Sequence, residues 1–369
     1  MLSATTPIVL LQHDGLTNLS GKTGLAMLRY RPGPIVAVVD PSQPTGSLEA
    51  ITGIRRTVPV VSNLRAALPF GPEAAVVGLA PSGGRLPDGL RADLEAALAA
   101  GLNLASGLHT RLGSDPQLAA LLRPGQWIWD LRQEPAGLAV AAGRAAALGG
   151  ERFLAVGTDM AVGKMSACLE LTAAARRQGI DARFVATGQA GILISGGGVP
   201  LDAVRLDFAA GAVEAAVLTA AAGAGDDTLL FVEGQGSLCH PGSSASLPLI
   251  RGSQPTGFLL VHRAGQTALT NHPALALPPL RQLIDTIEQL AALGRTGTAP
   301  APRVRAVALN TARLGEAEAS SACAAIGSET GLTCADPVRS LAAADRLLEA
   351  LRADEGIRTP GWRHHKPLP

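Results

Sequence analysis

The chain has 369 residues, of which 47% are hydrophobic, 17% charged and 3% aromatic, and its formal net charge is +1. Nucleic acid and anionic membranes attract a surplus of basic residues, and single-stranded nucleic acid also needs aromatic rings for stacking, so both classes of partner are excluded. The length is enough for two domains of ordinary size, each with a hydrophobic core of its own.

The first 149 residues alternate short β-branched apolar runs with alanine-rich stretches of helical period, a pattern typical of βα units and a largely parallel sheet. Strands are predicted at 7–12, 35–40, 58–61, 74–80, 103–107 and 127–130, with a helix most clearly at 91–100. Residues 139–153 indicate a connecting helix and a turn, so we place the domain boundary near Gly149.

The second domain, residues 150–369, repeats the alternation. Strands are predicted at 153–157, 182–188, 228–234, 257–262 and 303–310, with a helix at 166–178. Each strand ends in a polar residue or glycine, at the edge where open α/β sheets bind their ligands. The polar, proline-containing segment 356–369 is predicted to be an extended tail.

The cysteines and the N-terminal residues indicate the cellular compartment of the protein. Residues 1–15 have no basic n-region, and their apolar run of about six residues is too short for a signal peptide or a membrane span. The four cysteines, Cys168, Cys239, Cys323 and Cys334, show no CxxC spacing. This pattern fits neither a disulfide framework nor a zinc site, so we expect a cytoplasmic protein.

Lysine occurs only at Lys22, Lys164 and Lys366, and the first two follow a glycine in glycine-rich loops. The loop Gly15–Thr23 follows a strand and precedes a helix-like stretch, which allows three interpretations: a P-loop, a dinucleotide-type turn or a structural turn. Asp40 ends the next strand, where a Rossmann fold places its ribose-binding acid, but the G-x-G-x-x-G spacing that NAD binding requires is missing. We expect a Rossmann-like domain whose loop faces a cleft, with an open choice of ligand.

The loop Gly157–Ser166, with the sequence GTDMAVGKMS, follows a strand and opens a helix, as a Walker A loop does. Its glycines would let backbone N–H groups surround phosphates, while the lysine neutralises them. Two features depart from the standard motif: five residues separate Gly157 from Gly163, and Met165 stands where Ser or Thr normally contacts magnesium. The alternative is an ordinary turn before a helix. The predicted cofactor-binding residues are Gly157, Thr158, Asp159, Gly163, Lys164, Met165, Ser166 and, at the end of a later strand, Asn310.

Glu233 ends the apolar strand 228–234 and is followed by Gly234 and Gly236. A carboxylate at this position can hold magnesium or orient an attacking group; the alternative is a solvated strand end. Together with GTDMAVGK, the FVEGQG stretch resembles dethiobiotin synthetase and its ATP-using relatives, which supports a P-loop sheet here. His240 in the following loop and His262 at a strand end are proton-carrier candidates, or structural hydrogen-bonding residues.

Other strand ends offer substrate contacts. Gln189 follows strand 182–188 and faces a ligand or forms a simple turn. Asp202, Arg205 and Asp207 have helical spacing and indicate either a substrate site or a solvated helix face. Asn310 would read a nucleotide base or a pantetheine amide, or cap a turn.

These pieces together resemble one family. The KT of Lys22-Thr23, VVD, GLAPSGG, SGLH, DLR, GTDMAVGKMS, ATGQAG, VEGQGSLCHPG and VALNT occur in the same order in the DUF1611 family, also called the D-glutamate N-acetyltransferase (DgcN-like) family. The resemblance covers nearly the whole chain. It implies a Rossmann-like domain followed by a P-loop domain, and it makes GKM the family's own form of the loop.

The resemblance also implies an activity: acetyl transfer from acetyl-CoA to the amino group of D-glutamate, in a catabolic route with a partner deacetylase. The phosphates of CoA suit the loop at Lys164. From spacing alone, the hypotheses are Glu233 or His240 as base and the Gly234–Ser237 amides as oxyanion donors, with Arg205 pairing to a substrate carboxylate. The predicted substrate-binding residues are Gln189, Arg205, Gln235 and Ser237.

Two other functions compete. An ATP-dependent ligase or kinase would place Ser166 and Glu233 on magnesium. A non-catalytic regulator would bind a nucleotide or CoA and do no chemistry. Met165 favours CoA over magnesium and ATP, because the usual metal-contacting hydroxyl is missing. The expected partner is a small amino-acid substrate, and the sequence is compatible with a homo-oligomer.

Overall fold

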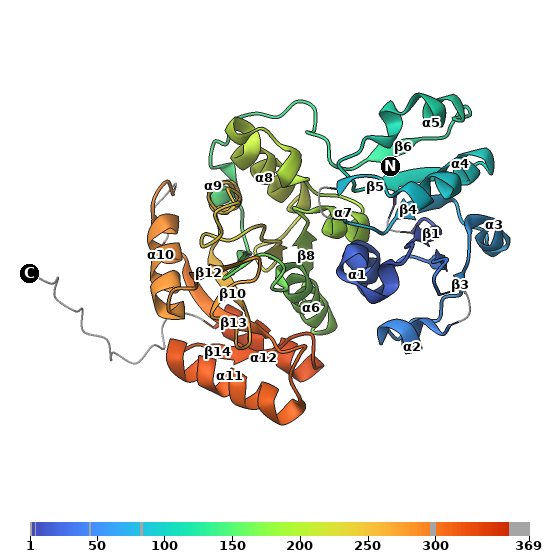
Figure 1. The fold of residues 1–369 in the computed structure, drawn as a ribbon. Helices are drawn as coiled ribbons and strands as arrows, with labels where there is room; N and C mark the ends of the chain where they lie inside the picture. The colour runs from blue at the N-terminus through green and yellow to red at the C-terminus, as the bar shows by residue number, and fades with distance from the viewer. Residues whose placement is uncertain (1, 4, 44–45, 82–83, 296–299, 354–369) are drawn as a thin grey trace, which may run out of the picture.

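The computed structural model describes residues 2–3, 5–43, 46–81, 84–295 and 300–353 and shows two α/β domains side by side (Figure 1). The tail predicted at 356–369 lies outside the described residues. Within the described part of the chain, no helix is both long and apolar enough to cross a membrane.

The first domain is built on one parallel sheet. Its strands are β1 (Ile8–Leu11), β2 (Ile35–Val39), β3 (Val60–Val61), β4 (Ala74–Val77), β5 (Asn103–Ser106) and β6 (Ile128–Asp130). Its helices are α1 (Lys22–Tyr30), α2 (Leu48–Thr52), α3 (Leu64–Ala67), α4 (Arg91–Ala99) and α5 (Pro116–Ala120). The strand order β3-β2-β1-β4-β5-β6 is that of a Rossmann fold, which confirms the predicted fold of this domain.

Strand β1 shows why these residues form a central strand. All four of its residues are buried: Ile8 and Leu10 face a cluster with α1, while Val9 and Leu11 face a cluster with α3 and α4. Because successive side chains of a strand point to opposite faces, a continuous apolar run is buried on both sides.

The second domain is also built on a parallel sheet. Its strands are β7 (Glu151–Gly157), β8 (Ala182–Val185), β9 (Leu229–Val232), β10 (Gly257–Arg263), β13 (Arg303–Asn310) and β14 (Thr333–Ala335), in the order β14-β13-β10-β7-β9-β8. Its helices are α6 (Lys164–Arg177), α7 (Gln189–Ser195), α8 (Leu206–Ala220), α9 (Ser246–Ser253), α10 (Leu280–Ala292), α11 (Glu316–Thr330) and α12 (Leu341–Arg352). A small antiparallel pair, β11 (Ala268–Leu269) and β12 (His272–Ala276), follows β10.

Helices cover both faces of the second sheet. Helices α6 and α12 pack on one face with Phe153 and Phe231, while α8, α9 and α10 pack on the other with Leu154 and Leu260. The central strand β7 leads directly into the glycine loop before α6, so this loop starts at the carboxyl edge of the sheet.

The prediction of a connecting helix over 139–153 is wrong for most of that segment. Only a 3-10 turn, Arg144–Ala147, precedes β7. The backbone N–H groups of Ala142 and Arg144 donate to the buried carboxylate of Glu214 on α8, at 3.2 and 2.9 Å. Because Glu214 accepts these donors, the segment follows α8 instead of forming the longer helix that its alanines favour.

The two domains meet through α1 and α7, which lie beside each other (Figure 1). Met27 and Leu28 of α1 share an apolar cluster with Ile192 and Leu193 of α7. At the end of α1, the buried Arg31 donates to the Leu193 carbonyl at 2.8 Å and also to two carbonyls of the N-terminal segment. The interface therefore combines apolar packing with a buried charged donor.

We predict that Arg31→Met weakens this interface, because methionine keeps the apolar stem and removes the donors from three carbonyls. The free energy of unfolding should fall by about 2 to 3 kcal/mol, and the two domains should unfold at separate urea concentrations. Arg56→Met is the matched control, since its guanidinium bonds the carbonyls of Leu28, Arg31 and Gly33 inside the first domain. An unchanged single transition in Arg31→Met would contradict this account.

Candidate functional site

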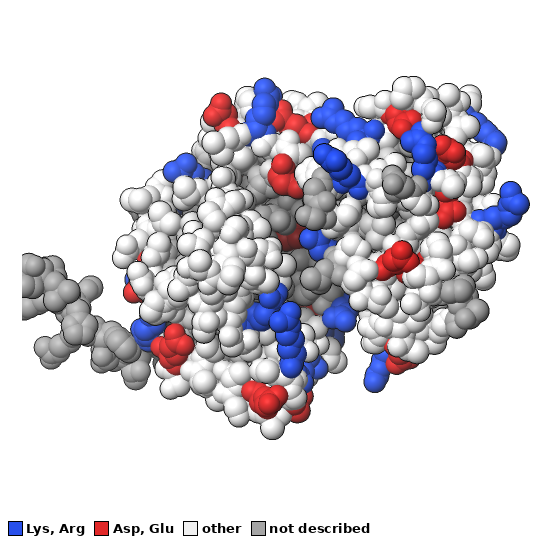
Figure 2. All heavy atoms as spheres, viewed as in Figure 1, with Lys and Arg blue, Asp and Glu red and all other residues white. Residues whose placement is uncertain are grey.

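A cleft of about 1370 Å³ is lined by residues of both domains. The first domain contributes the loop before α1 and one face of that helix, and the second contributes the 157–166 loop, α7 and the loop after β9. Figure 2 shows the molecule hollowed between its two lobes, with Lys and Arg side chains around the opening. The cleft is large enough for a nucleotide-sized ligand and a small second substrate.

The 157–166 loop delivers the start of α6 to this cleft. Gly163 precedes the helix with φ of 116°, a conformation that glycine adopts readily and other residues avoid. No side chain caps the helix at this position. The first N–H groups of α6 are therefore left for an external acceptor, and the helix dipole favours an anion there.

Lys164, the first residue of α6, is buried and donates from Nζ to the Asp159 carbonyl oxygen at 2.9 Å. Burial lowers the pKa of Lys164 to about 8, against the opposing charges of Asp159 and Glu233. A Cβ at Gly157 or Gly234 would press on the lysine side chain at 2.9 Å. These two glycines therefore leave the space through which Lys164 reaches the loop.

Glu233 follows β9, as predicted, and its carboxylate is buried beside the same loop. It accepts from the backbone N–H groups of Thr187 at 2.9 Å and Gly188 at 3.1 Å. Burial raises the pKa of Glu233 to about 7, although these N–H groups, Lys164 and the Gln235 amide oppose the shift. A carboxyl group with a pKa near neutrality is suited to proton transfer at physiological pH.

Thr158 and Asp159 brace the loop and do not line the cleft. The Thr158 hydroxyl lies 2.9 Å from Nδ1 of His262, a buried residue whose pKa is lowered to about 4 by burial and then by Arg263. The Asp159 carboxylate accepts from the side chain of Gln266 and the N–H of Thr270. These contacts tie the loop to β10 and the segment that follows it.

Met165 and Ser166 line the cleft as residues of α6. Met165 packs into the apolar cluster that joins α1 to α7, which explains why a thioether stands at this position instead of a hydroxyl. The Ser166 hydroxyl lies beside the Tyr30 hydroxyl, and burial raises the pKa of Tyr30 well above its usual range. Within the described ranges, no three His, Cys, Asp or Glu side chains gather as metal ligands.

Gln189 and Gln235 also line the cleft. With its amide nitrogen facing the first domain, Gln189 donates to the Gly107 carbonyl at 2.7 Å and accepts from Arg132 at 3.1 Å. Arg132 further approaches Asp202 at 3.2 Å. Gln189 at the start of α7 thus links the end of β5 and Arg132 to the second domain.

Three of the predicted catalytic and substrate-binding residues lie outside the cleft lining that the structure describes. Arg205 pairs with Glu134 at 2.7 Å and covers Phe208, so the proposed partner for a substrate carboxylate already has a carboxylate. The buried Ser237 hydroxyl donates to the Thr158 carbonyl at 3.0 Å and is thus structural. The His240 ring packs edge-on against His272, 5.0 Å away.

Asn310 belongs to a second cavity of about 230 Å³. This cavity shares Arg29, Gly163 and Ser166 with the cleft, so the two spaces meet at the start of α6. The Asn310 amide donates to the Val162 carbonyl at 2.9 Å, and Val338 also lines this cavity. An elongated ligand can therefore extend from the cleft across the 157–166 loop into this cavity.

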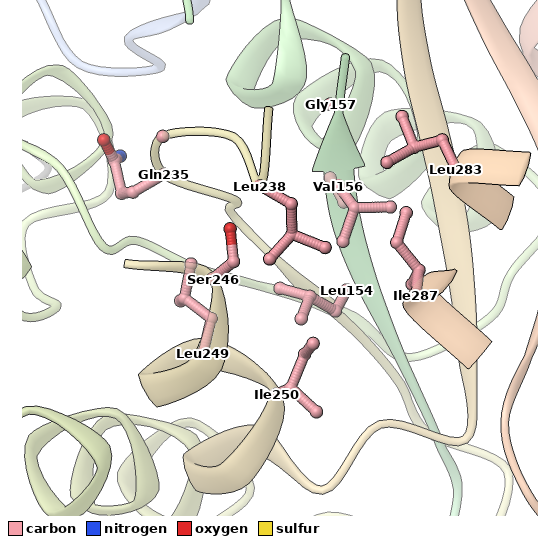
Figure 3. A pocket seen from close by; sticks show the side chains of 12 residues that line it. Leu154, Val156, Gly157, Gln235, Leu238, Ser246, Leu249, Ile250, Leu283 and Ile287 are labelled. Carbon is pink, nitrogen blue, oxygen red and sulfur yellow. The ribbon is translucent and has the colours of Figure 1, made fainter. Parts of the chain in front are cut away.

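A third space lies below the sheet edge (Figure 3), where Leu154 and Val156 of β7 meet apolar side chains of α9 and α10. Its volume of about 10 Å³ is no larger than that of one water molecule. This space is therefore packing beneath Gly157 and Gln235, not a ligand site.

Sequence reasoning missed several residues that line the cleft. The DLR motif contains Arg132, for which the sequence indicates no role, and it indicates none for Arg29, Tyr30 and Thr23 on α1. The Gly15–Thr23 loop does face the cleft, as expected. Asp40 is committed to that loop: its carboxylate accepts from the N–H groups of Asp14 at 2.9 Å and Leu16 at 3.4 Å, instead of being free for a ribose.

Family models match both domains. Residues 42–134 match the Rossmann-like domain DUF1611_N, and residues 139–348 match the P-loop domain of DUF1611, both described as domains of unknown function. A crystal structure of a DUF1611 family protein from Anabaena variabilis is 51% identical and aligns with a TM-score of 0.88, covering 94% of this chain and 99% of that one.

Two curated relatives carry the name D-glutamate N-acetyltransferase. The protein from Tritonibacter scottomollicae is 35% identical over 351 residues, which cover 94% of this chain and 99% of the relative. The protein from a Pseudoalteromonas species is 35% identical over 272 residues, which cover 73% of this chain and 79% of the relative.

The raised pKa of Glu233 predicts a pH dependence of stability. Between its ordinary value of 4.5 and about 7, the folded state holds a proton that the unfolded state releases, so the free energy of unfolding falls as pH rises through this window. Glu233→Gln keeps a neutral side chain and should remove this fall. Urea unfolding at about pH 5 and about pH 7.5 measures it, with Glu349→Gln on the surface of α12 as control. A fall of equal size in Glu233→Gln would show that Glu233 is not its source.

Proposed function

We propose that this chain, which belongs to the DUF1611 family, transfers an acetyl group from acetyl-CoA to the amino group of a D-amino acid such as D-glutamate. The name of the two curated relatives, D-glutamate N-acetyltransferase, supports the reaction class. The observation that carries the proposal is the position of Glu233: a buried carboxyl group with a pKa near 7 lies beside a phosphate-type loop, in a cleft that both domains line.

The residues present fit the donor. CoA carries a pyrophosphate, for which the start of α6 supplies N–H groups and Lys164 supplies a positive charge. The nucleoside end would enter the cavity at Asn310, because that cavity meets the cleft at Gly163 and Ser166. The pantetheine arm would then lie in the larger cleft, towards Glu233.

Glu233 would act as the general base. An amino acid reaches the site as an ammonium ion, which must lose a proton before its nitrogen can attack the thioester carbonyl. Glu233 takes that proton and releases it to solvent. The C–N bond then forms, the nitrogen gives its second proton to Glu233, the C–S bond breaks, and the departing thiolate receives this second proton from Glu233. Residues 234–236 line the same cleft, and their backbone N–H groups would stabilise the developing oxyanion.

The competing activity, an ATP- and magnesium-dependent ligase or kinase, would use the same loop. Ser166 and Glu233 both line the cleft, which supports this second candidate. Met165 favours CoA, because its side chain is packed between the domains and has no hydroxyl for magnesium. A non-catalytic regulator would bind ligand without turnover.

Calorimetric titration with acetyl-CoA, CoA, NAD and ATP, the last with and without magnesium, tests the donor. We expect the CoA species to bind and Lys164→Ala to weaken that binding about a hundredfold, since a buried positive charge is lost. Arg177→Ala, which removes a cation from the other end of α6, should bind normally. Heat from magnesium-ATP but none from CoA would overturn the transferase proposal.

A second arm of the same titration tests the orientation of the donor. Val338→Trp would fill the cavity at Asn310 from a half-exposed position. It should weaken CoA binding about tenfold and leave turnover of acetyl-pantetheine, which has no nucleotide, unchanged. If Val338→Trp impaired the reactions of acetyl-CoA and acetyl-pantetheine equally, the nucleotide of CoA would not lie in this cavity.

We expect Glu233→Gln to lower kcat by about a hundredfold or more, because the variant has no base for the ammonium. In the parent protein, kcat/KM should rise with pH through about 7 as Glu233 loses its proton. His240→Gln is the comparison, since His240 was the other candidate base and packs against His272. A larger loss in His240→Gln than in Glu233→Gln would reverse the assignment.

A further inference from the structure

The start of α1 forms a second concentration of donors on the first-domain wall of the cleft. Thr17, Asn18, Lys22 and Thr23 all line the cleft. Helix α1 has nine residues, and Gly21 at its N-cap supplies no side-chain hydrogen bond. The N–H of Gly24 already donates to the Gly78 carbonyl at 2.8 Å, so the N–H groups of Lys22 and Thr23 are the ones that lack the usual cap and favour an anion.

Thr23 supplies independent evidence for a ligand. Its side chain is 1% exposed, and its hydroxyl has no hydrogen-bond partner among the described residues, although it lines the cleft. An unpaired buried hydroxyl costs free energy that a bound acceptor would recover. Lys22, one residue earlier, is exposed and makes no ion pair with the described part of the chain. A hydroxyl and an ammonium thus remain available at one helix start.

The surrounding residues hold this loop in place. Gln12 donates from Nε2 to the Gly21 carbonyl at 2.9 Å, and a Cβ at Gly24 would strike the Gln12 amide. Asp40 fixes the beginning of the loop through the N–H groups of Asp14 and Leu16. The Asp40 carboxylate is thereby occupied, and the backbone of the loop that precedes Lys22 and Thr23 is held in place before any ligand binds.

We propose that Lys22, Thr23 and the N-terminus of α1 bind a carboxylate of the acceptor amino acid. This inference rests on the proposed acetyl transfer. The 157–166 loop already has the donors for the phosphates of CoA. Arg205 pairs with Glu134 and the cleft-lining Arg132 pairs with Asp202, whereas Lys22 remains available to the acceptor. One cleft connects Lys22 to Glu233, so an amino acid bound by its carboxylate at α1 would present its ammonium to the second domain.

Steady-state kinetics of Lys22→Gln and Thr23→Val test the site. A charged hydrogen bond to carboxylate predicts a rise of about tenfold or more in the KM for D-glutamate for Lys22→Gln, and a smaller rise for the near-isosteric Thr23→Val. The KM for acetyl-CoA and kcat should change less than about twofold. Arg65→Gln, which removes an exposed cation from α3 of the same domain, is the matched control. A raised KM for acetyl-CoA with an unchanged KM for D-glutamate would assign the site to a phosphate of CoA and overturn the proposal.

Titration with D-glutamate, with and without CoA, separates this inference from the proposed function. If the parent protein binds D-glutamate in a manner that depends on Lys22 but never acetylates it, the carboxylate site stands and the transferase proposal fails. If the parent acetylates D-glutamate while Lys22→Gln and Thr23→Val leave both binding and KM unchanged, the transferase stands and this inference fails.

Discussion

The second domain depends on the burial of two opposite charges, Lys164 and Glu233, at the carboxyl edge of one sheet. Burying either charge is costly, and each is offset by backbone hydrogen bonds and by nearby opposite charge, Asp159 and Glu233 for the lysine and Lys164 for the glutamate. Burial moves the pKa of Lys164 down and that of Glu233 up, towards each other and towards neutrality. A Cβ at Gly234 would clash with the Ala155 carbonyl, and a Cβ at Gly157 would crowd the Nζ of Lys164, so glycines at both positions leave room for the buried lysine. The glycines that make the loop conspicuous in the sequence therefore also determine its protonation chemistry.

The contact between α1 and α7 determines where that chemistry meets its substrates. Arg31 bonds the carbonyl of Leu193, and Gln189 bonds that of Gly107, so both ends of the interface carry hydrogen bonds between domains. Met165 packs into the same interface from the loop that carries Lys164. A residue that looks like a defect in a phosphate loop is, in this fold, part of the packing that joins the two walls of the cleft.

The alternation of apolar runs was sufficient to predict both parallel sheets, because strands buried on two faces have a distinctive pattern. The 157–166 loop and Glu233 were identifiable because strand-end residues of neighbouring strands meet at one edge. Sequence reasoning did not reveal that Arg205 pairs with Glu134, since the two residues lie 71 positions apart and no local pattern indicates the pair. The helix predicted over 139–153 failed similarly, through the buried carboxylate of Glu214. Long-range pairing of polar groups is the information that a single sequence does not contain.

The two domains offer different binding chemistry, because their glycine-lysine loops bury different groups. In the second domain, Lys164 is buried at the start of α6. A buried cation beside free N–H groups suits a multiply charged phosphate chain, whose oxygens accept strong hydrogen bonds from charged donors. The first domain leaves Lys22 exposed and keeps only the Thr23 hydroxyl buried, an arrangement with fewer donors and less charge compensation. The two glycine-lysine loops therefore differ in burial and charge. For this reason the loop at Lys164 is proposed to bind acetyl-CoA, and the loop at Lys22 is proposed to bind the amino acid. Because the two loops belong to different domains, the reacting groups would meet only when the α1–α7 interface is intact.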